Sequence, residues 1–280
     1  MRFEMERTET RLINNFRSIS LFGVLLVFLC VSGFMDLATA QETLRLSCSA
    51  QVYEAFRGET LETFTKKTGI PVNVEIFSSS EAIARLENGL SDVCTTAEEL
   101  ENRYKLQGYL AFPFCNDALE IIANVSIPVE TVTSEQLREI FSGTLTNWNQ
   151  VGGPDQRIVV IIPSKQTAAF KNFSRMVMKG NEVRFDLMTS RSTAVVEAVR
   201  NSPWSISLAT QGATLGNLKG NKVLKVNGLW PRDPSYPYVQ TFSIVTRGKP
   251  EGAVKKFVHF VFSNIGAKIL IDRGMTPYAK

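Results

Sequence analysis

From Leu44 onward, segments with the pattern of strands alternate with segments with the pattern of helices. Apolar residues recur at about every second position in the former and at three- or four-residue spacing in the latter. Strands joined through helices make right-handed crossovers and therefore lie parallel in one sheet. The sequence thus predicts an α/β fold, with strands at Leu44–Cys48, Pro71–Phe77 and Asp92–Cys94 and helices at Tyr53–Thr68 and Glu81–Glu87.

The second half of the chain repeats this alternation between two connecting strands. Phe112–Asn124 predicts an extended strand that leaves the first sheet, and Tyr238–Thr246 predicts a strand that returns to it. A helix from Glu251 to about Asn264 follows. Between the two connecting strands we expect the strands Ile158–Ile162, Pro203–Leu208 and Val223–Val226 and the helices Ala168–Met178 and Ala194–Asn201.

The N-terminal segment has the composition of an export signal. Arginines recur from Arg2 to Arg17, an apolar run extends from Leu21 to Phe34, and the small residues Ala38-Thr39-Ala40 precede Gln41. This order is typical of a cleaved secretory signal peptide. We expect a signal peptide over residues 1–40 and an exported, soluble chain that starts at Gln41. An uncleaved membrane anchor is the alternative, although the apolar run is short for a membrane span.

The cysteines favour free thiols. Cys30 raises the alternative of a lipid anchor, but Leu29 is a poor residue directly before a lipidated cysteine. Cleavage would leave Cys48, Cys94 and Cys115, which allow one disulfide or none, and their spacing matches no zinc site. We expect them to be reduced and buried, because neighbours on parallel strands seldom have the geometry that a disulfide needs.

The charge of the chain favours a small anionic ligand over a nucleic acid. The formal net charge is +4, and it is spread along the sequence without runs of lysine and arginine. Such an excess is too diffuse to indicate a nucleic-acid partner. The sole histidine, His259, lies in an apolar helical pattern, where we expect a surface or packing residue. We therefore expect no metal site, no cofactor and no nucleic-acid partner.

Serine-rich turns follow the first and second predicted strands. Ser49-Ala50-Gln51 and Ser78-Ser79-Ser80 each lead into a helix. Hydroxyls and free backbone N–H groups at a helix start can hold an anion. The alternative is that each serine only caps its helix. Because the carboxyl ends of parallel strands meet at one edge of a sheet, two such turns favour a shared anion site.

Two further turns of this kind follow in the second half. One contains Ser164, Lys165 and Gln166, and Lys165 is the best-placed cation for an anion held by that loop. The alternative is a solvated lysine at a helix start, where the helix dipole slightly disfavours a cation. The other turn, Ser190-Arg191-Ser192-Thr193, contains Arg191, whose planar guanidinium suits an oxyanion.

The stretch Ser134–Gly153 predicts a short amphipathic helix and a turn anchored by Trp148. Thr133 or Ser134 can cap this helix, and Gly143 can end it in the left-handed conformation. As a string, IFSGTLTNWNQVGG resembles a segment of the phosphate-binding proteins that feed ABC importers. The likeness extends over most of the chain and includes TGIPV, NGLSDV and the ending FVHFVFSNIGAKILIDRGMTP.

This resemblance implies a two-lobed periplasmic-binding-protein fold that closes on its ligand by hinge motion. Each lobe would be a mainly parallel sheet flanked by helices, with residues 43–120 and 240–280 in lobe one and residues 121–239 in lobe two. It also implies a monomeric periplasmic solute-binding protein that captures a small inorganic oxyanion and delivers it to an ABC permease. Transport rather than catalysis is expected, and the sequence has neither a G-x-S-x-G elbow nor a histidine within a plausible triad.

The resemblance also assigns ligand-binding positions, one residue at a time. Thr95 and Thr96 replace the serine-led pair that the family has after the acidic position of the third strand. In the second lobe, Lys165 stands where the family has a glycine, and the family's arginine and acidic residue are missing. The expected ligand-binding residues are Ser49, Ala50, Ser79, Ser80, Asp92, Ser164, Lys165, Gln166 and Arg191.

These departures leave two questions open. Phosphate carries a proton at neutral pH, so a site selective for phosphate offers a carboxylate acceptor, whereas donors alone would suit sulfate. The second-lobe loop contains no acidic residue, so the sequence does not fix the anion. The alternative function is a domain of the same fold that no longer transports and acts as a sensor or interaction protein with an altered or absent ligand.

Overall fold

The computed structural model describes residues 42–191 and 194–278. The predicted signal peptide over residues 1–40, its cleavage before Gln41 and the residue Cys30 lie outside the described residues. Within the described ranges, every helix is too short or too polar to cross a membrane.

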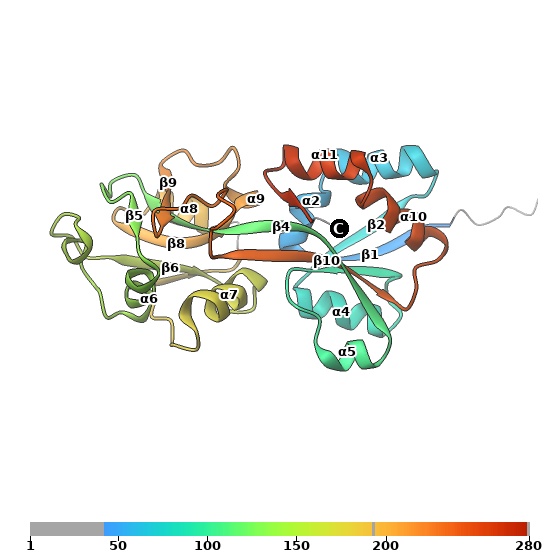
Figure 1. The fold of residues 1–280 in the computed structure, drawn as a ribbon, viewed down its shortest axis with the longest axis horizontal. Helices are drawn as coiled ribbons and strands as arrows, with labels where there is room; N and C mark the ends of the chain where they lie inside the picture. Colours follow the sequence, from blue (N-terminus) through green and yellow to red (C-terminus); the bar gives the residue numbers. More distant parts are fainter. Residues whose placement is uncertain (1–41, 192–193, 279–280) are drawn as a thin grey trace, which may run out of the picture. The chain divides into compact units, whose positions relative to one another are not determined.

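The first lobe is a sheet with helices on both faces (Figure 1). β1 (Leu44–Ser49) lies between β2 (Val72–Phe77) and β3 (Val93–Thr96), and both pairings are parallel, as predicted. One face packs against the phenylalanines of α2, α3 and α10 and the other against α4 and α5. These helices, with the C-terminal α11, are α2 (Ala50–Phe56), α3 (Glu59–Thr68), α4 (Ser79–Glu87), α5 (Asn102–Leu106), α10 (Gly252–Val261) and α11 (Asn264–Asp272).

Two long antiparallel strands run through both lobes (Figure 1). β4 (Tyr109–Asn124) pairs with β10 (Val239–Arg247) along its first part and with strands of the second lobe along its last part. The predicted departing and returning strands are therefore confirmed. The short β11 (Thr276–Pro277) also pairs with β4.

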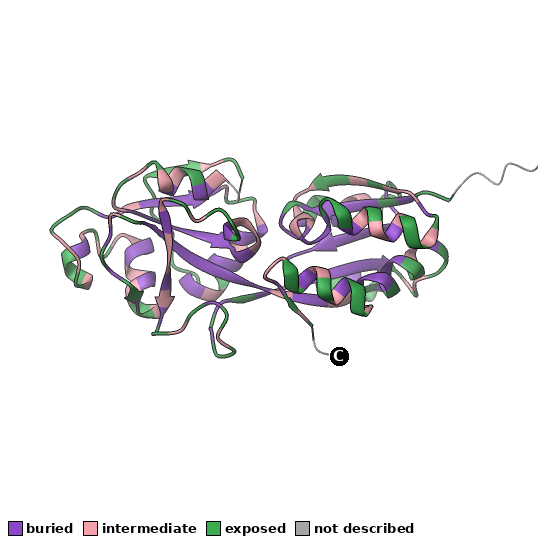
Figure 2. Ribbon diagram, turned by 90° about the horizontal axis from the view of Figure 1, so that it is seen from above, coloured by how far each residue is buried: buried purple, intermediate pink, exposed green. Residues whose placement is uncertain are grey.

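The second lobe repeats the parallel arrangement. β6 (Val159–Pro163) pairs in parallel with β7 (Leu187–Thr189) and with β8 (Ser205–Thr210), while β9 (Asn221–Val226) pairs with β4 and β5 (Thr131–Val132). Figure 2 shows the central strands of both lobes buried and the helices exposed on their outer sides, while the edge strands β2 and β7 have no buried residue. The helices are α6 (Ser134–Ser142), α7 (Ala168–Phe173), α8 (Ala194–Arg200) and α9 (Gln211–Thr214), with the short turns η1 (Trp148–Val151) and η2 (Ser174–Met178).

The stretch that carries the family resemblance folds as predicted. The Thr133 hydroxyl accepts from the Gln136 N–H, and the Gln136 side chain accepts from the Thr133 N–H, so a capping box starts α6. Gly143 ends the helix with φ of 78°. Trp148 is fully buried, and its indole N–H donates to the Trp204 carbonyl over 2.9 Å. This turn therefore supports the sheet of the second lobe.

Several predicted boundaries were wrong. The single helix expected over Tyr53–Thr68 is divided into α2 and α3, because Gly58, with φ of 62° and ψ of −129°, breaks the helical path. The helix expected over Ala168–Met178 changes to a π-helical turn at Ser174. The sequence did not predict α5, β7 and α9, which are too short to show a periodic pattern.

The cysteines lie as expected. Cys48, Cys94 and Cys115 are buried and free of disulfides, and Cys48 lies on β1 beside β3, which carries Cys94. Burial raises the pKa of Cys48 to about 12 despite a hydrogen bond from Thr95. His259 is exposed on the last turn of α10. Within the described ranges, no cluster of His, Cys, Asp and Glu side chains is arranged to hold a metal ion.

Candidate functional site

A cleft of about 620 Å³ lies where strands of both sheets end. It is lined by residues that follow β1 and β2 in the first lobe and β6, β7 and β8 in the second lobe. Parallel strands present the starts of the following helices at their carboxyl ends, so this is where an α/β sheet binds ligands. Of the predicted ligand-binding residues, the structure brings together Ser49, Ala50, Ser79, Ser164, Gln166 and Arg191.

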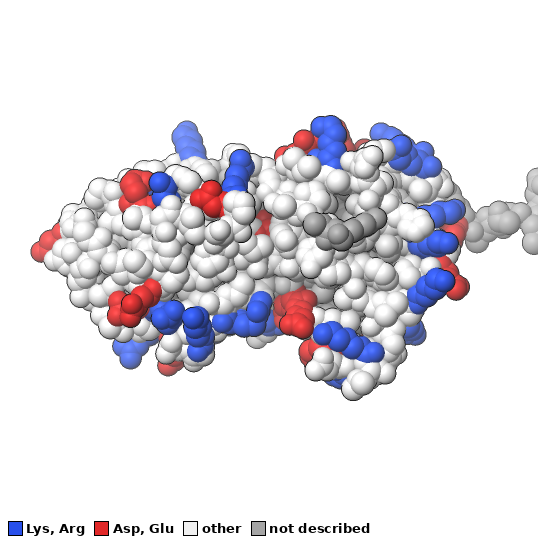
Figure 3. All heavy atoms as spheres, viewed as in Figure 1, with Lys and Arg blue, Asp and Glu red and all other residues white. Residues whose placement is uncertain are grey.

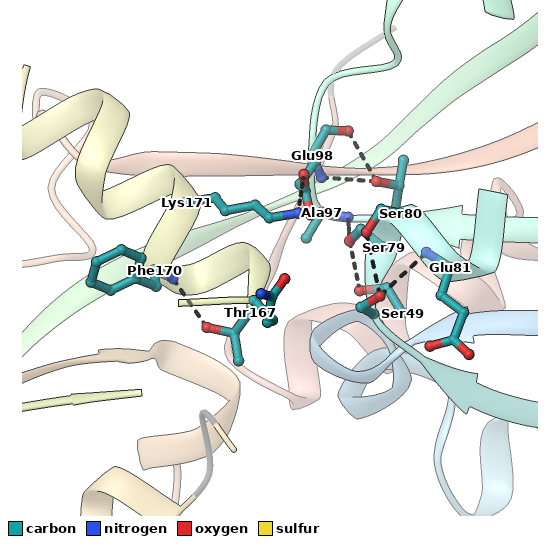
Figure 4. Close-up of polar contacts among 12 residues, drawn as sticks. Ser49, Ser79, Ser80, Glu81, Ala97, Glu98, Thr167, Phe170 and Lys171 are labelled. Carbon is teal, nitrogen blue, oxygen red and sulfur yellow. Dashed lines mark hydrogen bonds and ion pairs between the residues drawn. The ribbon is translucent and has the colours of Figure 1, made fainter. Parts of the chain in front are cut away.

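A chain of hydrogen bonds joins the two serine turns of the first lobe (Figure 4). The Ala97 N–H donates to the Ser79 hydroxyl over 3.2 Å, and the Ser79 hydroxyl donates to the Ser49 hydroxyl over 3.0 Å. Both serines are almost fully buried. A hydroxyl has one hydrogen to donate, and that of Ser79 is used on Ser49. Ser49 still has its own hydrogen for a ligand in the cleft, so Ser79 orients Ser49 rather than donating directly.

Capping explains one of these turns but not the other. The Ser78 hydroxyl accepts from the Glu81 N–H over 3.2 Å and caps α4. Ser49 occupies the corresponding position before α2, yet it accepts no bond from the first turn of that helix, all of which is described. The Ser49 N–H instead donates to the Thr95 hydroxyl over 3.1 Å. The Ser49 hydroxyl is therefore held for another partner than the helix.

In the second lobe, the capping residue is Thr167, which was not predicted from the sequence as a site residue. Its hydroxyl accepts from the Phe170 N–H over 3.3 Å, and Thr167 itself lines the cleft. The Ser164 hydroxyl accepts from the Gln166 N–H over 3.3 Å and also retains a hydrogen that it can donate. Thr167 stands directly before the apolar start of this helix, and that position could have identified it as the cap from the sequence.

Among the described residues that line the cleft, the cation is Arg191 and not Lys165. The Lys165 ammonium lies 5.4 Å from the centre of the Phe185 ring, and Lys165 is not among the described residues that line the cleft. A cation over an aromatic face is attracted by the ring quadrupole. Arg191 follows β7 and reaches the cleft wall. The structure therefore does not bring Lys165 to the predicted site and does bring Arg191 there.

Ser80 and Asp92 also lie outside the cleft. Ser80 is exposed, and its hydroxyl is 3.4 Å from that of Ser78. Asp92 precedes β3, at the opposite end from the cleft, and forms an ion pair with Arg45 over 2.6 Å. Burial raises the pKa of Asp92, but the hydrogen bonds and charge of Arg45 outweigh this, and the pKa is lowered. The carboxylate of Asp92 is thus engaged with Arg45 and does not face the other site residues.

The cleft wall contains polar residues that were not predicted from the sequence as ligand-binding residues. Gln51 is 6% exposed, and neither atom of its amide has a hydrogen-bond partner within the described ranges. Glu54, one helical turn further along α2, is the one carboxylate among the described residues that line the cleft, and it pairs with Arg57 over 3.0 Å. Glu54 could have been predicted from the sequence, because it lies three residues after Gln51 and this spacing places both residues on one side of a helix.

Polar contacts also connect the two lobes beside this cleft. The Asn172 amide on α7 donates to the Ala97 carbonyl over 2.7 Å and to the Gln240 side chain over 3.0 Å. Gln240 donates in turn to the buried Asp117 on β4 over 3.1 Å. Burial raises the pKa of Asp117 to about 7, although the bond from Gln240 opposes this. The peptide groups of Ala97 therefore bond to Ser79 in one lobe and to Asn172 in the other.

A Lys171–Glu98 ion pair of 3.0 Å adds a second link between the lobes (Figure 4). Lys171 is therefore engaged between the lobes and is not free to bind a ligand. On the face drawn in Figure 3, basic and acidic side chains are interspersed over both lobes.

Comparison with known proteins identifies the family. The family model described as the PBP superfamily domain matches residues 37–264. The chain belongs to the PBP superfamily. Its curated relatives include the phosphate-binding protein PstS of Borreliella burgdorferi, which is 26% identical over 72% of this chain and 78% of that protein. Protein SphX of Synechococcus elongatus is 26% identical over 86% of this chain and 79% of its own length.

Solved structures also share the fold. A Clostridium perfringens protein solved with bound phosphate, and described as a phosphate ABC transporter substrate-binding protein, gives a TM-score of 0.76 at 21% identity over 85% of this chain and all of that one. An ABC-type phosphate transport receptor from Vibrio cholerae gives 0.71 at 22% identity over 83% of this chain and 99% of the other. The two-lobed fold and the predicted family resemblance are confirmed.

Proposed function

We propose that this member of the PBP superfamily is an exported solute-binding protein that captures a small oxyanion in the cleft and delivers it to an ABC permease. The observation that carries the proposal is the Ser49 hydroxyl, which is oriented by Ser79 and does not cap its own helix. Ser164 and Arg191 from the second lobe line the same cleft. Hydroxyl donors and a cation from two lobes match the requirements of an anion that is held between them.

Phosphate suits this cleft better than sulfate. At neutral pH phosphate carries a proton and needs one acceptor, whereas sulfate needs only donors. Glu54 supplies a carboxylate in the cleft wall, on the side of the first lobe. The acceptor that the second-lobe loop lacks would therefore come from α2. The curated relatives PstS are named as phosphate-binding proteins, which supports the same choice.

The proposal includes a location and a partner. Export through the segment 1–40 would place a monomeric protein in the periplasm, where a membrane permease could receive the anion. N-terminal sequencing of the periplasmic protein should find Gln41 first. A chain that starts at Cys30 with added lipid mass would contradict this part of the proposal.

Titration calorimetry with phosphate, sulfate and molybdate tests the binding function. We expect phosphate to bind most tightly, and we expect uptake of labelled phosphate by the cells to fall when the gene is deleted. If the protein binds no oxyanion, the proposal is wrong, and a sensor or interaction role for the domain takes its place.

A further inference from the structure

The cleft contains more than the groups that an inorganic oxyanion would use. Gln51 lines the cleft and is 6% exposed, and its buried amide has no hydrogen-bond partner for its nitrogen or its oxygen within the described ranges. Buried amides without a partner are rare in folded proteins, because they lose their bonds to water. The amide offers both donors and an acceptor, so its partner must be able to donate as well as accept.

Gln51 adjoins Ser49 in the sequence and in the cleft lining. It belongs to the first turn of α2, directly after Ser49 and Ala50, and Glu54 extends the same side of the helix. This side of α2 packs closely against Gly212 of α9 in the second lobe. A side chain at position 212 would place its Cβ only 3.4 Å from the Cβ of Glu54. Gln51 and Glu54 therefore line the cleft on the side of α2 that Glu54 brings into contact with α9.

The cleft is also lined by large apolar side chains. These are Tyr53 on α2 and Ile76 and Phe77 at the end of β2. Ile76 is paired with Cys48 across β1 and β2, one residue before Ser49, and it is 49% exposed. A large apolar side chain exposed inside a cleft gains free energy when a carbon group of a ligand covers it.

We propose that the cleft binds an organic oxyanion of the phosphomonoester class, with a hydroxyl-bearing carbon part beside the phosphate. The oxyanion lies at Ser49, its hydroxyl bonds to the Gln51 amide, and its carbon atoms contact Ile76. Inorganic phosphate is uniformly polar and compact, so it leaves the apolar side chains of the cleft uncovered. The volume of about 620 Å³ lies within the roughly 300–1,000 Å³ that is typical of sites for organic ligands.

This inference rests on the proposed function, because it places the oxyanion at the same Ser49 site. Glycerol 3-phosphate and inorganic phosphate are the probes, and calorimetry on the full chain gives the affinity for each. We expect glycerol 3-phosphate to bind at least about tenfold more tightly than inorganic phosphate. If neither probe binds, the proposed function fails as well; if phosphate binds as tightly as glycerol 3-phosphate, only the present inference is wrong.

Variants of Gln51 and Ile76 test whether these residues contact the organic part of the ligand. Gln51→Leu and Ile76→Ser should each reduce the preference for glycerol 3-phosphate over inorganic phosphate about three- to tenfold. Gln51→Leu should also raise the melting temperature, because it removes an unpartnered buried amide. Leu106→Ser, at a residue that is 88% exposed and outside the cleft, is the matched control for Ile76→Ser and should change neither affinity. An unchanged preference in both cleft variants would overturn the inference.

Discussion

The Ser79 hydroxyl donates to the Ser49 hydroxyl over 3.0 Å, and this bond joins the turns that follow the neighbouring strands β2 and β1. Ser79 is fixed in turn by the Ala97 N–H. Because Ser79 uses its hydroxyl hydrogen on Ser49, of these two serines only Ser49 can donate a hydrogen bond to an anion. Two serines that the sequence presents as equivalent thus have different roles: Ser49 is the donor to the ligand and Ser79 positions it.

Alanine variants of the three serines should separate these roles. Hydrogen bonds to a charged group contribute about 1.5–3 kcal/mol, so Ser49→Ala should weaken phosphate binding roughly tenfold to a hundredfold. Ser79→Ala should weaken it less, by about three- to tenfold, because Ser49 keeps its hydrogen but loses its orientation. Ser80→Ala is the control, since Ser80 is exposed and outside the cleft. Calorimetry that finds Ser80→Ala as harmful as Ser49→Ala would contradict this assignment.

The position of Arg191 predicts the salt dependence of binding. Arg191→Gln should weaken phosphate binding about tenfold at low salt and reduce the loss of affinity that wild type shows at high salt, because salt screens the exposed cation. Lys165→Gln should change the affinity by less than about twofold, since Lys165 lies over Phe185. Titrations at two salt concentrations measure both effects. A larger effect of Lys165→Gln would show that Lys165 binds the anion and would contradict this assignment.

The raised pKa of the buried Asp117 should make the stability of the protein depend on pH. Burial raises its pKa to about 7 in the folded protein from an ordinary value of 3.8. The folded state therefore binds more protons than the unfolded state between these values, and the free energy of unfolding should fall as pH rises through this range. Between pH 5 and pH 8 the contribution of Asp117 should fall by roughly 2–3 kcal/mol.

Asp117→Asn keeps an oxygen that can accept from Gln240 but does not titrate. Urea unfolding of this variant and of wild type at pH 5 and pH 8 isolates the contribution of Asp117. The variant should gain stability relative to wild type at pH 8 only. An identical pH dependence in the two proteins would show that Asp117 titrates normally.

The thiols should be unreactive while the protein is folded. Cys48, Cys94 and Cys115 are buried, and burial raises the pKa of each, so little thiolate exists at pH 8. A colorimetric thiol reagent should find none of them in the native mature chain and all of them after denaturation without reductant. A single thiol in the denatured chain would instead reveal a disulfide.

Local chemistry in the sequence predicted the scaffold. The capping box at Thr133 and Gln136 and the end of α6 at Gly143 depend on residues within one short segment, so the sequence contains all the information. The parallel pairing of β1 with β3 follows from the order of strands and helices. The division into α2 and α3 at Gly58 was missed, because apolar spacing continues across the break.

The site was predicted only in part, because side-chain directions depend on tertiary contacts. Lys165 has the sequence position of an anion-binding cation, but it turns to Phe185 on a segment twenty residues further along the chain. Asp92 has the position of a ligand residue by resemblance, but Arg45 engages it at the other end of the strand. The sequence places Gln51 in the first serine turn, but only the folded structure shows that its amide is buried without a hydrogen-bond partner within the described ranges.

The most direct test of the central claim is to locate a bound anion. Arsenate has the shape and protonation of phosphate, and arsenic gives an anomalous X-ray signal. A crystal of the protein soaked in a low concentration of arsenate should show one anomalous peak in the cleft, within hydrogen-bond distance of the Ser49 hydroxyl. No peak in the cleft, or a peak only at a surface site away from Ser49, would contradict the account.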